Sequence, residues 1–192
     1  MIVRLADPGD AAALARIYGH HVTHGLGTFE EQPPDAAEMA ARVSAVTTLG
    51  LPYLVAERDG ILGFAYVAPF RPRGAYRHTV EDSVYVAPGA AGRGVGKALL
   101  AAVIDRCEAL DLRQMLAVIG DSANAASIGL HAALGFTHAG RCAAVGFKHG
   151  QWVDIVWMQR ALNDGASSLP SAERDGPRWR PGWGGDEGAG GA

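Results

Sequence analysis

The segment VYVAPGAAGRGVGKALL, residues 84–100, has the residue types and spacing of a ligand-binding loop. An apolar, β-branched run leads into three alternating glycines, Gly92, Gly94 and Gly96, and a pattern of helical period follows them. Glycines at such a junction leave backbone N–H groups uncovered where a helix begins, and the partial positive charge there favours an anion such as a diphosphate. The segment therefore predicts an anion-binding loop, with a plain glycine-rich turn as the alternative.

Individual residues exclude two common nucleotide-binding motifs. A P-loop requires GxxxxGK[ST], but Ala91 replaces the first glycine, and Lys97 is followed by Ala98, which has no hydroxyl for magnesium. A dinucleotide fingerprint requires GxGxxG, whereas the spacing here is GxGxG. What remains is an anion site made mainly of backbone N–H groups.

Two adjacent carboxylates precede this loop. Glu81 and Asp82 lie in a predicted strand, so their side chains point to opposite faces and only one of them can face a given site. A carboxylate beside a ligand-binding loop can act as a general base. From spacing alone, a solvated strand end is the competing interpretation.

Composition limits the classes of protein that can carry this loop. The chain has 192 residues, 48% of them hydrophobic and 19% charged, which is enough for one domain with a full core. The net charge is −3, and lysine and arginine are scattered, so nucleic acid is not an expected partner. We find no secretory leader and no apolar run of about 18 residues, so we expect a cytoplasmic protein without a membrane span.

Metal chemistry is not predicted either. The two cysteines have no metal-ligand spacing. His20 and His24 have the i, i+4 spacing that a metal uses, but no further ligand is evident, and cations are favourable near a helix C-terminus in any case.

Periodicity and turn residues predict alternating helices and strands. Helices are expected from residue 7 to about 24, from 35 to about 46, after the glycine loop, and over 124–134; strands are expected over 53–58, 61–68, 79–86, 114–119, 136–148 and 152–162. Asp59 and Gly60 predict a two-residue type I′ hairpin, and His149 with Gly150 a second turn. Trp152 and Ile155 are expected to pack in the strand core, with a wall near the site as the alternative. The fold class is therefore mixed α and β.

Composition changes sharply at residue 163. Residues 1–162 are the predicted domain, and residues 163–192 are rich in glycine, proline and serine, with Leu169 as the only aliphatic anchor. Such a segment cannot offset its ordering entropy by burial, so we expect a disordered tail. Trp179 and Trp183 are interpreted as incidental aromatics in it, with a docking peptide as the alternative.

Two motifs resemble those of the GNAT superfamily of N-acetyltransferases. GRGVGKALL, residues 92–100, is similar to its acyl-CoA pyrophosphate loop, and NAASIGLHAALGF, residues 124–136, to its second CoA-contacting helix. Ala91 departs from the glutamine or arginine usual in that loop, from which we expect weaker anchoring of the phosphates. The resemblance implies a mixed, mostly antiparallel sheet with helices on both faces, and acetyl-CoA as cosubstrate.

A narrower resemblance covers about residues 3–162. AYRHTVEDSVYVAP, residues 75–88, and GFKHGQWVDIVWMQ, residues 146–159, are similar to the branch that acetylates phosphinothricin and methionine sulfoximine or sulfone. This implies transfer to the α-amino group of a small amino-acid analogue by direct attack with a general base, a role in herbicide or antibiotic resistance, and a homodimer. Transfer to another amine, such as a peptide N-terminus or a polyamine, and a non-catalytic acyl-CoA sensor stay open.

The resemblance also implies site residues. Glu81 matches the general base, and His131 occupies the position of the group that meets the leaving CoA thiolate. The implied cosubstrate contacts are Val84, Tyr85, Val86, Gly92, Arg93, Gly94, Val95, Gly96, Lys97, Asn124 and Ser127, where Asn124 is also the expected helix N-cap. The implied acceptor pocket contains Phe29, Arg71, Arg73 and Tyr76. Arginine forks suit a substrate with a carboxylate and a second oxygen-rich group.

Overall fold

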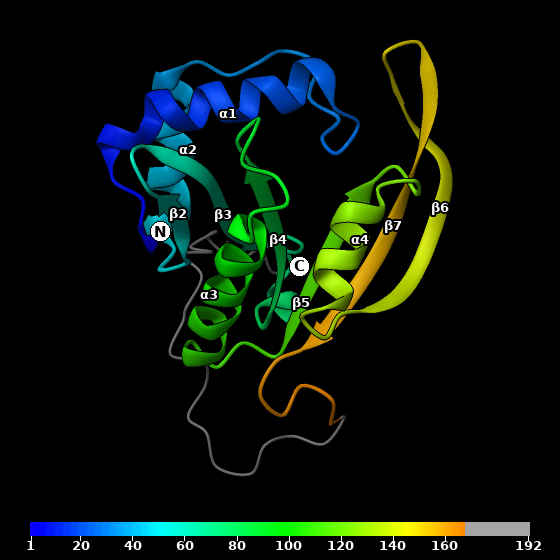
Figure 1. Cartoon of the computed structure of the whole chain (residues 1–192). Helices are drawn as coiled ribbons and strands as arrows, with labels where there is room; N and C mark the ends of the chain where they lie inside the picture. Colours follow the sequence, from blue (N-terminus) through cyan, green and yellow to red (C-terminus); the bar gives the residue numbers. More distant parts are fainter. Residues whose placement is uncertain (168–192) are drawn as a thin grey trace, which may run out of the picture.

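A seven-stranded sheet organises residues 1–167, the part of the chain that the computed structural model describes (Figure 1). Its strands are β1 (Ile2–Leu5), β2 (Tyr53–Glu57), β3 (Ile61–Pro69), β4 (Thr79–Val86), β5 (Gln114–Gly120), β6 (Thr137–Lys148) and β7 (Gln151–Ala161). Their order is β1-β2-β3-β4-β5-β7-β6, and all neighbours are antiparallel except β4 and β5. The mixed, mostly antiparallel sheet is confirmed.

Helices cover both faces of this sheet (Figure 1). One face packs against α1 (Ala11–His24) and α2 (Ala36–Thr48), around a core that includes Tyr53 and Phe64. The opposite face packs against α3 (Val95–Ala109) and α4 (Ala125–Ala132), around a second core that includes Met115 and Ala117. The predicted fold class is confirmed. Within residues 1–167, no helix combines the length and apolar character needed to cross a membrane.

Side-chain caps fix where two of these helices begin. The Asp35 side chain accepts a hydrogen bond from the Glu38 N–H at the start of α2, and Asn124 accepts one from Ser127 at the start of α4. Each cap satisfies a backbone donor that has no partner within its helix. The α4 cap sets the direction of the helix that carries His131.

β1 is the strand that the sequence pattern did not reveal. Its four residues, IVRL, are too few to show an alternation, and its outer positions Ile2 and Leu5 are exposed. Pairing with β2 defines it: Val3 lies opposite Ala56, and the Arg4 Nε donates to Glu57 at 2.8 Å. A strand this short becomes visible only through its partner.

The two hairpins differ in how well the sequence predicted them. Asp59 and Gly60 both have positive φ, 56° and 121°, as predicted, but Glu57 pairs with Ile61, so Arg58 also belongs to the loop. A register shift after Ala56 adds Arg58 to the loop, and the prediction of a two-residue turn is therefore wrong. The β6–β7 turn is confirmed, because strand pairing continues up to Lys148 and Gln151 on its two sides.

The β6–β7 hairpin extends beyond the rest of the sheet. Pairing between β5 and β7 stops where Gly120 meets Ile155, so the residues of β7 before Ile155 have only β6 beside them. Trp152 is consequently 69% exposed and packs edge-on against Phe147, 5.2 Å between ring centroids. The expectation that Trp152 lies in the strand core is wrong for this reason.

The described chain continues past the predicted domain boundary as far as residue 167. The Asn163 side-chain amide donates to the carbonyls of Glu108 and Leu112. Most of the predicted tail, including Trp179 and Trp183, lies outside the described residues.

Candidate active site

β4 and β5 separate after four paired positions, Thr79–Gln114 to Asp82–Ala117. The N–H of Ala87 donates to β3, and peptide groups alternate along a strand, so those of Val84 and Val86 face the gap between β4 and β5. The Val86 carbonyl is already bonded to the His21 Nε2 at 2.9 Å, which means that this ring nitrogen is the donor. The separation leaves a backbone edge to which an extended ligand can bind.

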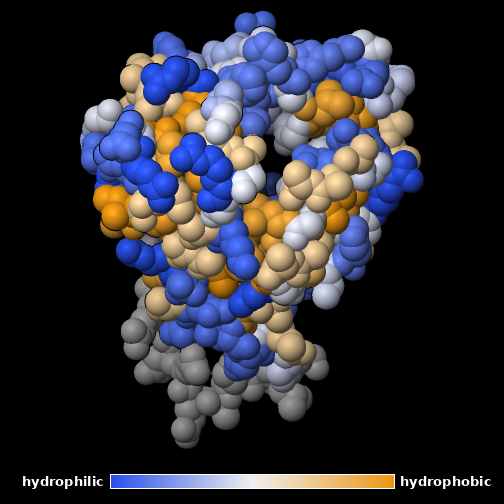
Figure 2. Space-filling view, in the orientation of Figure 1, coloured by the Kyte–Doolittle hydropathy of each residue, from blue (hydrophilic) through white to orange (hydrophobic). Residues whose placement is uncertain are grey.

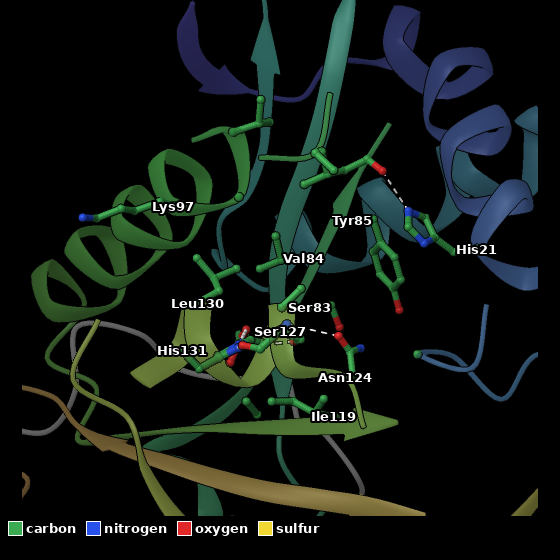
Figure 3. A pocket seen from close by; sticks show the side chains of 18 of the residues that line it. His21, Ser83, Val84, Tyr85, Lys97, Ile119, Asn124, Ser127, Leu130 and His131 are labelled. Atoms are coloured by element: carbon green, nitrogen blue, oxygen red, sulfur yellow. Dashed lines mark hydrogen bonds and ion pairs between the residues drawn. The ribbon is translucent and has the colours of Figure 1, made fainter. Parts of the chain in front are cut away.

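A cavity of about 480 Å³ occupies this gap. Figure 2 shows the surface hollowed between α3 and α4, and Figure 3 shows the lining side chains from close by. Eleven predicted site residues line it: Val84, Tyr85, Val86, Gly92, Gly94, Val95, Gly96, Lys97, Asn124, Ser127 and His131. His21, Gly27 and Asp82, which the sequence interpretation did not assign to the cosubstrate, line it too. Arg93 and Glu81 lie outside this lining.

The glycine loop lies at the cavity, at the start of α3. Gly92 and Gly94 have φ of 73° and 78°, a left-handed backbone that residues with a Cβ rarely adopt. Gly94 is the N-cap and offers no side-chain cap, so the N–H groups of the first helical turn stay available to an anion. Lys97, one turn into the helix, adds a positive charge to the lining. The loop has the form of the predicted diphosphate site.

α4 supplies the polar side chains on the other side of the cavity (Figure 3). The Asn124 Oδ1 is occupied by the Ser127 N–H at 3.1 Å, which confirms the predicted N-cap and leaves its amide nitrogen for a ligand. One turn further, the His131 Nδ1 lies 2.7 Å from the Ser127 carbonyl. This contact holds the imidazole ring against its own helix.

His131 has a second partner that no sequence motif indicated. Its Nε2 lies 3.0 Å from the Asp82 Oδ2, and the two side chains are 5% and 1% exposed. Burial lowers the pKa of His131, but the hydrogen bond to Asp82 and its charge outweigh this, so the pKa is raised. Burial raises the pKa of Asp82, although the hydrogen bond from His131 and its charge lower it. The pair therefore binds its shared proton firmly.

Glu81 lies on the opposite face of β4 from Asp82, as the strand alternation predicts. It is partly buried, and this burial raises the pKa of its carboxyl group while the charge of Arg71 lowers it. A raised pKa brings a carboxylate closer to the range in which it accepts protons near neutral pH. β4 thus presents one carboxylate on each side of the sheet.

The predicted acceptor residues fall into two places. Arg71 lies over the Phe70 ring, 4.5 Å from its centroid, and Tyr76 packs edge-on against the same ring at 5.5 Å. Arg73 is exposed at the start of the short helical turn that contains Tyr76. Phe29 lies against Gly146 of β6, whereas Arg71 and Tyr76 share the Phe70 ring.

Phe29 belongs to a loop held by a buried polar network. The Tyr18 hydroxyl bonds to Thr28 at 2.9 Å and donates to Glu30 at 2.8 Å. Lys148, only 2% exposed, donates its Nζ to the Thr28 carbonyl at 2.7 Å. Sequence interpretation missed this lysine, because a lysine near a turn carries no signal of burial.

A metal is not implied by this geometry. His20 and His24 stack on each other with centroids 4.6 Å apart. Among residues 1–167, no group of three His, Cys, Asp or Glu side chains is placed to hold a metal ion.

Comparison with known proteins agrees with the fold and the cavity. The model of the acetyltransferase (GNAT) domain matches residues 3–157. The chain is 56% identical over 169 residues to a phosphinothricin N-acetyltransferase of Alcaligenes faecalis, covering 88% of this chain and 86% of that protein. It is 39% identical to an L-methionine sulfoximine/L-methionine sulfone acetyltransferase of Salmonella typhimurium, covering 87% and 98%.

A solved structure is similarly close. The GNAT phosphinothricin acetyltransferase from Sinorhizobium meliloti, in complex with AcCoA, superposes with a TM-score of 0.84 at 47% identity, covering 89% of this chain and 93% of that one.

The family match and the similar proteins show that the chain is an acetyl-CoA-dependent N-acetyltransferase. The open β4 edge, the glycine loop and the capped α4 agree with this class. The chain belongs to the GNAT acetyltransferase family.

Proposed function

We propose that this protein transfers the acetyl group of acetyl-CoA to the α-amino group of a small amino acid that carries a tetrahedral phosphinyl or sulfonyl group, such as phosphinothricin or methionine sulfoximine or sulfone. The observation that carries the proposal is the placement of Glu81 beside Arg71, across the sheet from a cavity suited to the cosubstrate. The names of the similar proteins support the choice of substrate.

The cavity residues fit acetyl-CoA in chemistry and order. The N–H groups at Gly94 and the following turn would hold the diphosphate, and the peptide groups of Val84 with the N–H of Val86 would bind the amides of the pantetheine arm. The arm leads toward Asp82 and Ala117, where the two strands rejoin. The thioester is therefore expected beside His131.

Glu81 would act from the acceptor side of β4. Its carboxylate takes a proton from the α-ammonium group, directly or through water, because only the neutral amine attacks a thioester. A backbone N–H of the β4 segment stabilises the oxyanion that forms. His131, on the cavity side, meets the departing thiolate. Glu81 and His131 thus act from opposite faces of one strand.

Cationic and aromatic side chains would recognise the acceptor. Arg71 and Arg73 are suited to the carboxylate and the tetrahedral oxygens, since guanidinium groups bind such oxygens in bidentate fashion. Tyr76, 43% exposed, would form an apolar wall beside Arg71, and Phe29, 40% exposed and on a separate loop, would contact another part of the acceptor. A cationic acceptor such as a polyamine would be repelled by the arginines.

The proposed substrate class also suggests a cellular role for the enzyme. Acetylation removes the positive charge of the α-amino group, so the enzyme would confer resistance to such compounds in the cytoplasm. The exposed apolar side chains Val145, Phe147 and Trp152 on the β6–β7 hairpin support a homodimer.

Release of free CoA tests the proposal. The purified protein is given acetyl-CoA and, separately, phosphinothricin, methionine sulfoximine, methionine sulfone, ordinary amino acids, a peptide with a free N-terminus and a polyamine. We expect the highest kcat/KM with the tetrahedral analogues, and a loss of that preference in the Arg71→Ala/Arg73→Ala double variant. Turnover of the peptide or the polyamine alone would show that the proposed acceptor is wrong and that this amine is the substrate. Binding of acetyl-CoA without any turnover would indicate a sensor.

A further inference from the structure

The buried contact between Asp82 and His131 has no role in the acceptor chemistry above. Both residues line the cavity, from β4 and from α4, and they are 49 residues apart in the chain. Asp82 is 6% exposed, an unusual position for a carboxylate without a strong partner.

The hydrogen-bond geometry determines how many protons the pair holds. The His131 Nδ1 faces the Ser127 carbonyl, which can only accept, so Nδ1 carries a proton. The Nε2 faces a carboxylate oxygen at 3.0 Å, and a bond there requires a second proton, on either Nε2 or Oδ2. The pair is thus an imidazolium beside a carboxylate, or a neutral imidazole beside a carboxylic acid, with no net charge in either form.

The other oxygen of Asp82 restricts the choice further. Oδ1 is buried and has no hydrogen-bond partner in the described structure. A lone carboxylate in this position would be costly, so His131 is the group that stabilises it. The surrounding titratable groups do not compete: burial and the Asp82 charge raise the pKa of the Cys107 thiol of α3, so that thiol is neutral. Glu81 lies on the other face of β4, and β5 presents Ala117.

We propose that Asp82 is a positioning residue that keeps His131 protonated and oriented at the cavity, so that the charge of the imidazolium stabilises the departing CoA thiolate. This inference rests on the proposed function of the cavity. As the carbon–sulfur bond breaks, its electron pair goes to sulfur, and CoA leaves as the thiolate beside the imidazolium, whose two N–H groups stay bonded to Asp82 and to the Ser127 carbonyl. Glu81 accepts the proton lost by the amine. Solvent then takes the proton from Glu81 and supplies one to the released thiolate, while the Asp82–His131 pair keeps its proton throughout.

A charge-removing variant separates this role from simple packing. Asp82→Asn keeps the shape and allows the amide to donate to Nε2, so His131 stays in place but is neutral. We expect kcat to fall about 100-fold, with the acetyl-CoA dissociation constant unchanged within about twofold. The decline of kcat with rising pH should move to lower pH, because the carboxylate no longer favours the imidazolium. In Asp82→Asn/His131→Gln, kcat should equal that of His131→Gln alone.

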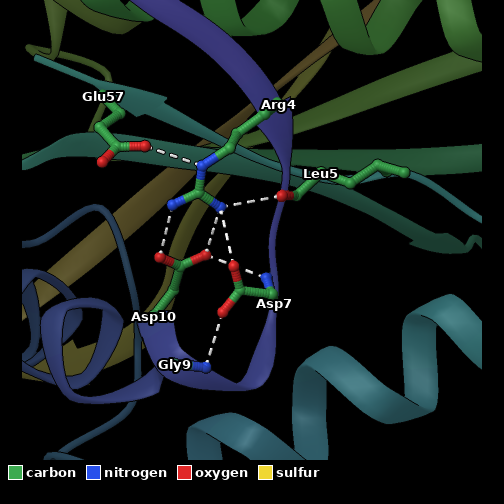
Figure 4. Close-up of polar contacts among 6 residues, drawn as sticks. All are labelled: Arg4, Leu5, Asp7, Gly9, Asp10 and Glu57. Carbon is green, nitrogen blue, oxygen red and sulfur yellow. Dashed lines mark hydrogen bonds and ion pairs between the residues drawn. The ribbon is translucent and has the colours of Figure 1, made fainter.

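Asp10→Asn is a matched control. Asp10 is also 6% exposed and accepts two hydrogen bonds of 2.8 Å from Arg4 (Figure 4), and neither residue lines the cavity. This variant weakens a partly buried ion pair outside the cavity, so it should change stability without moving the pH profile of kcat.

Nuclear magnetic resonance of ¹⁵N-labelled histidine tests the proposal without any acceptor. In the unmodified protein, the His131 ring should stay doubly protonated above the pH at which an ordinary histidine loses its proton, and Asp82→Asn should abolish this. A neutral His131 ring at or below that ordinary pH would overturn the proposal even if Asp82→Asn fails to fold. Unchanged kcat in Asp82→Asn, or additive losses in the double variant, would overturn it too. Failure of the acceptor panel with a protonated His131 would instead count against the proposed function alone.

Discussion

Replacing Gly146 by alanine should displace Phe29 and weaken use of the acceptor. A Cβ at Gly146 would lie 2.3 Å from the Phe29 Cε2 and 2.7 Å from two further ring carbons. Carbon atoms in contact are about 3.5–4.0 Å apart, so the ring must move by roughly 1 Å. Because Phe29 is 40% exposed, the ring can swing outward.

The displacement should act on catalysis more than on stability. A misplacement of about 1 Å near a reacting group can cost about 100-fold, so we expect kcat/KM for the amino-acid acceptor to fall by about 10- to 100-fold. Overpacking costs about 1–3 kcal/mol in a core, and the exposed side of Phe29 places this site at the lower end. Neither Gly146 nor Phe29 lines the cavity, so the acetyl-CoA dissociation constant should not change.

Steady-state CoA release measures the effect, with calorimetry for acetyl-CoA binding and a thermal melt for folding. Gly140→Ala is the control on the same strand, because a Cβ at Gly140 meets nothing within 4 Å. In the Gly146→Ala/Phe29→Ala double variant, kcat/KM should match that of Phe29→Ala alone. Unaltered kcat/KM in Gly146→Ala for every acceptor would refute the role given to Phe29.

Further predictions concern the base, a helix cap and a buried lysine. Because burial raises the pKa of Glu81, kcat should rise with pH through a limb above the 4.5 of an ordinary glutamate, and a pH profile of Glu81→Gln should lack that limb. Asn124→Ala removes the bond to the Ser127 N–H and should lower the free energy of unfolding by about 1 kcal/mol. It should also weaken acetyl-CoA binding in calorimetry; Asn124→Asp, which keeps the cap, should restore the stability. Lys148→Met leaves the buried Thr28 carbonyl without its donor and should cost about 1–3 kcal/mol in a denaturant melt.

Local patterns in the sequence predicted the parts of the fold that depend on neighbouring residues. The glycine loop, the Asn124 cap and the opposite orientation of Glu81 and Asp82 all follow from positions a few residues apart. The predicted length of the β2–β3 loop was wrong, because the partner strand and not the turn residues determines a register shift.

Contacts between distant segments could not be predicted in this way. Lys148 meets Thr28 across 120 residues, and Asp82 meets His131 across 49. Nothing in the local sequence of Lys148 shows that its ammonium group is buried. The resemblance supplied candidate residues, but only the fold shows that Asp82 faces the cosubstrate cavity and Glu81 does not.

The central claim is that the cosubstrate cavity and the general base lie on opposite faces of β4 and act separately. Turnover and acetyl-CoA binding of Glu81→Gln test it most directly, with saturating acetyl-CoA and phosphinothricin. We expect kcat to fall by at least about 100-fold, while the acetyl-CoA dissociation constant stays within about twofold of the unmodified protein. Equal losses of turnover and binding, or undiminished turnover, would contradict the assignment.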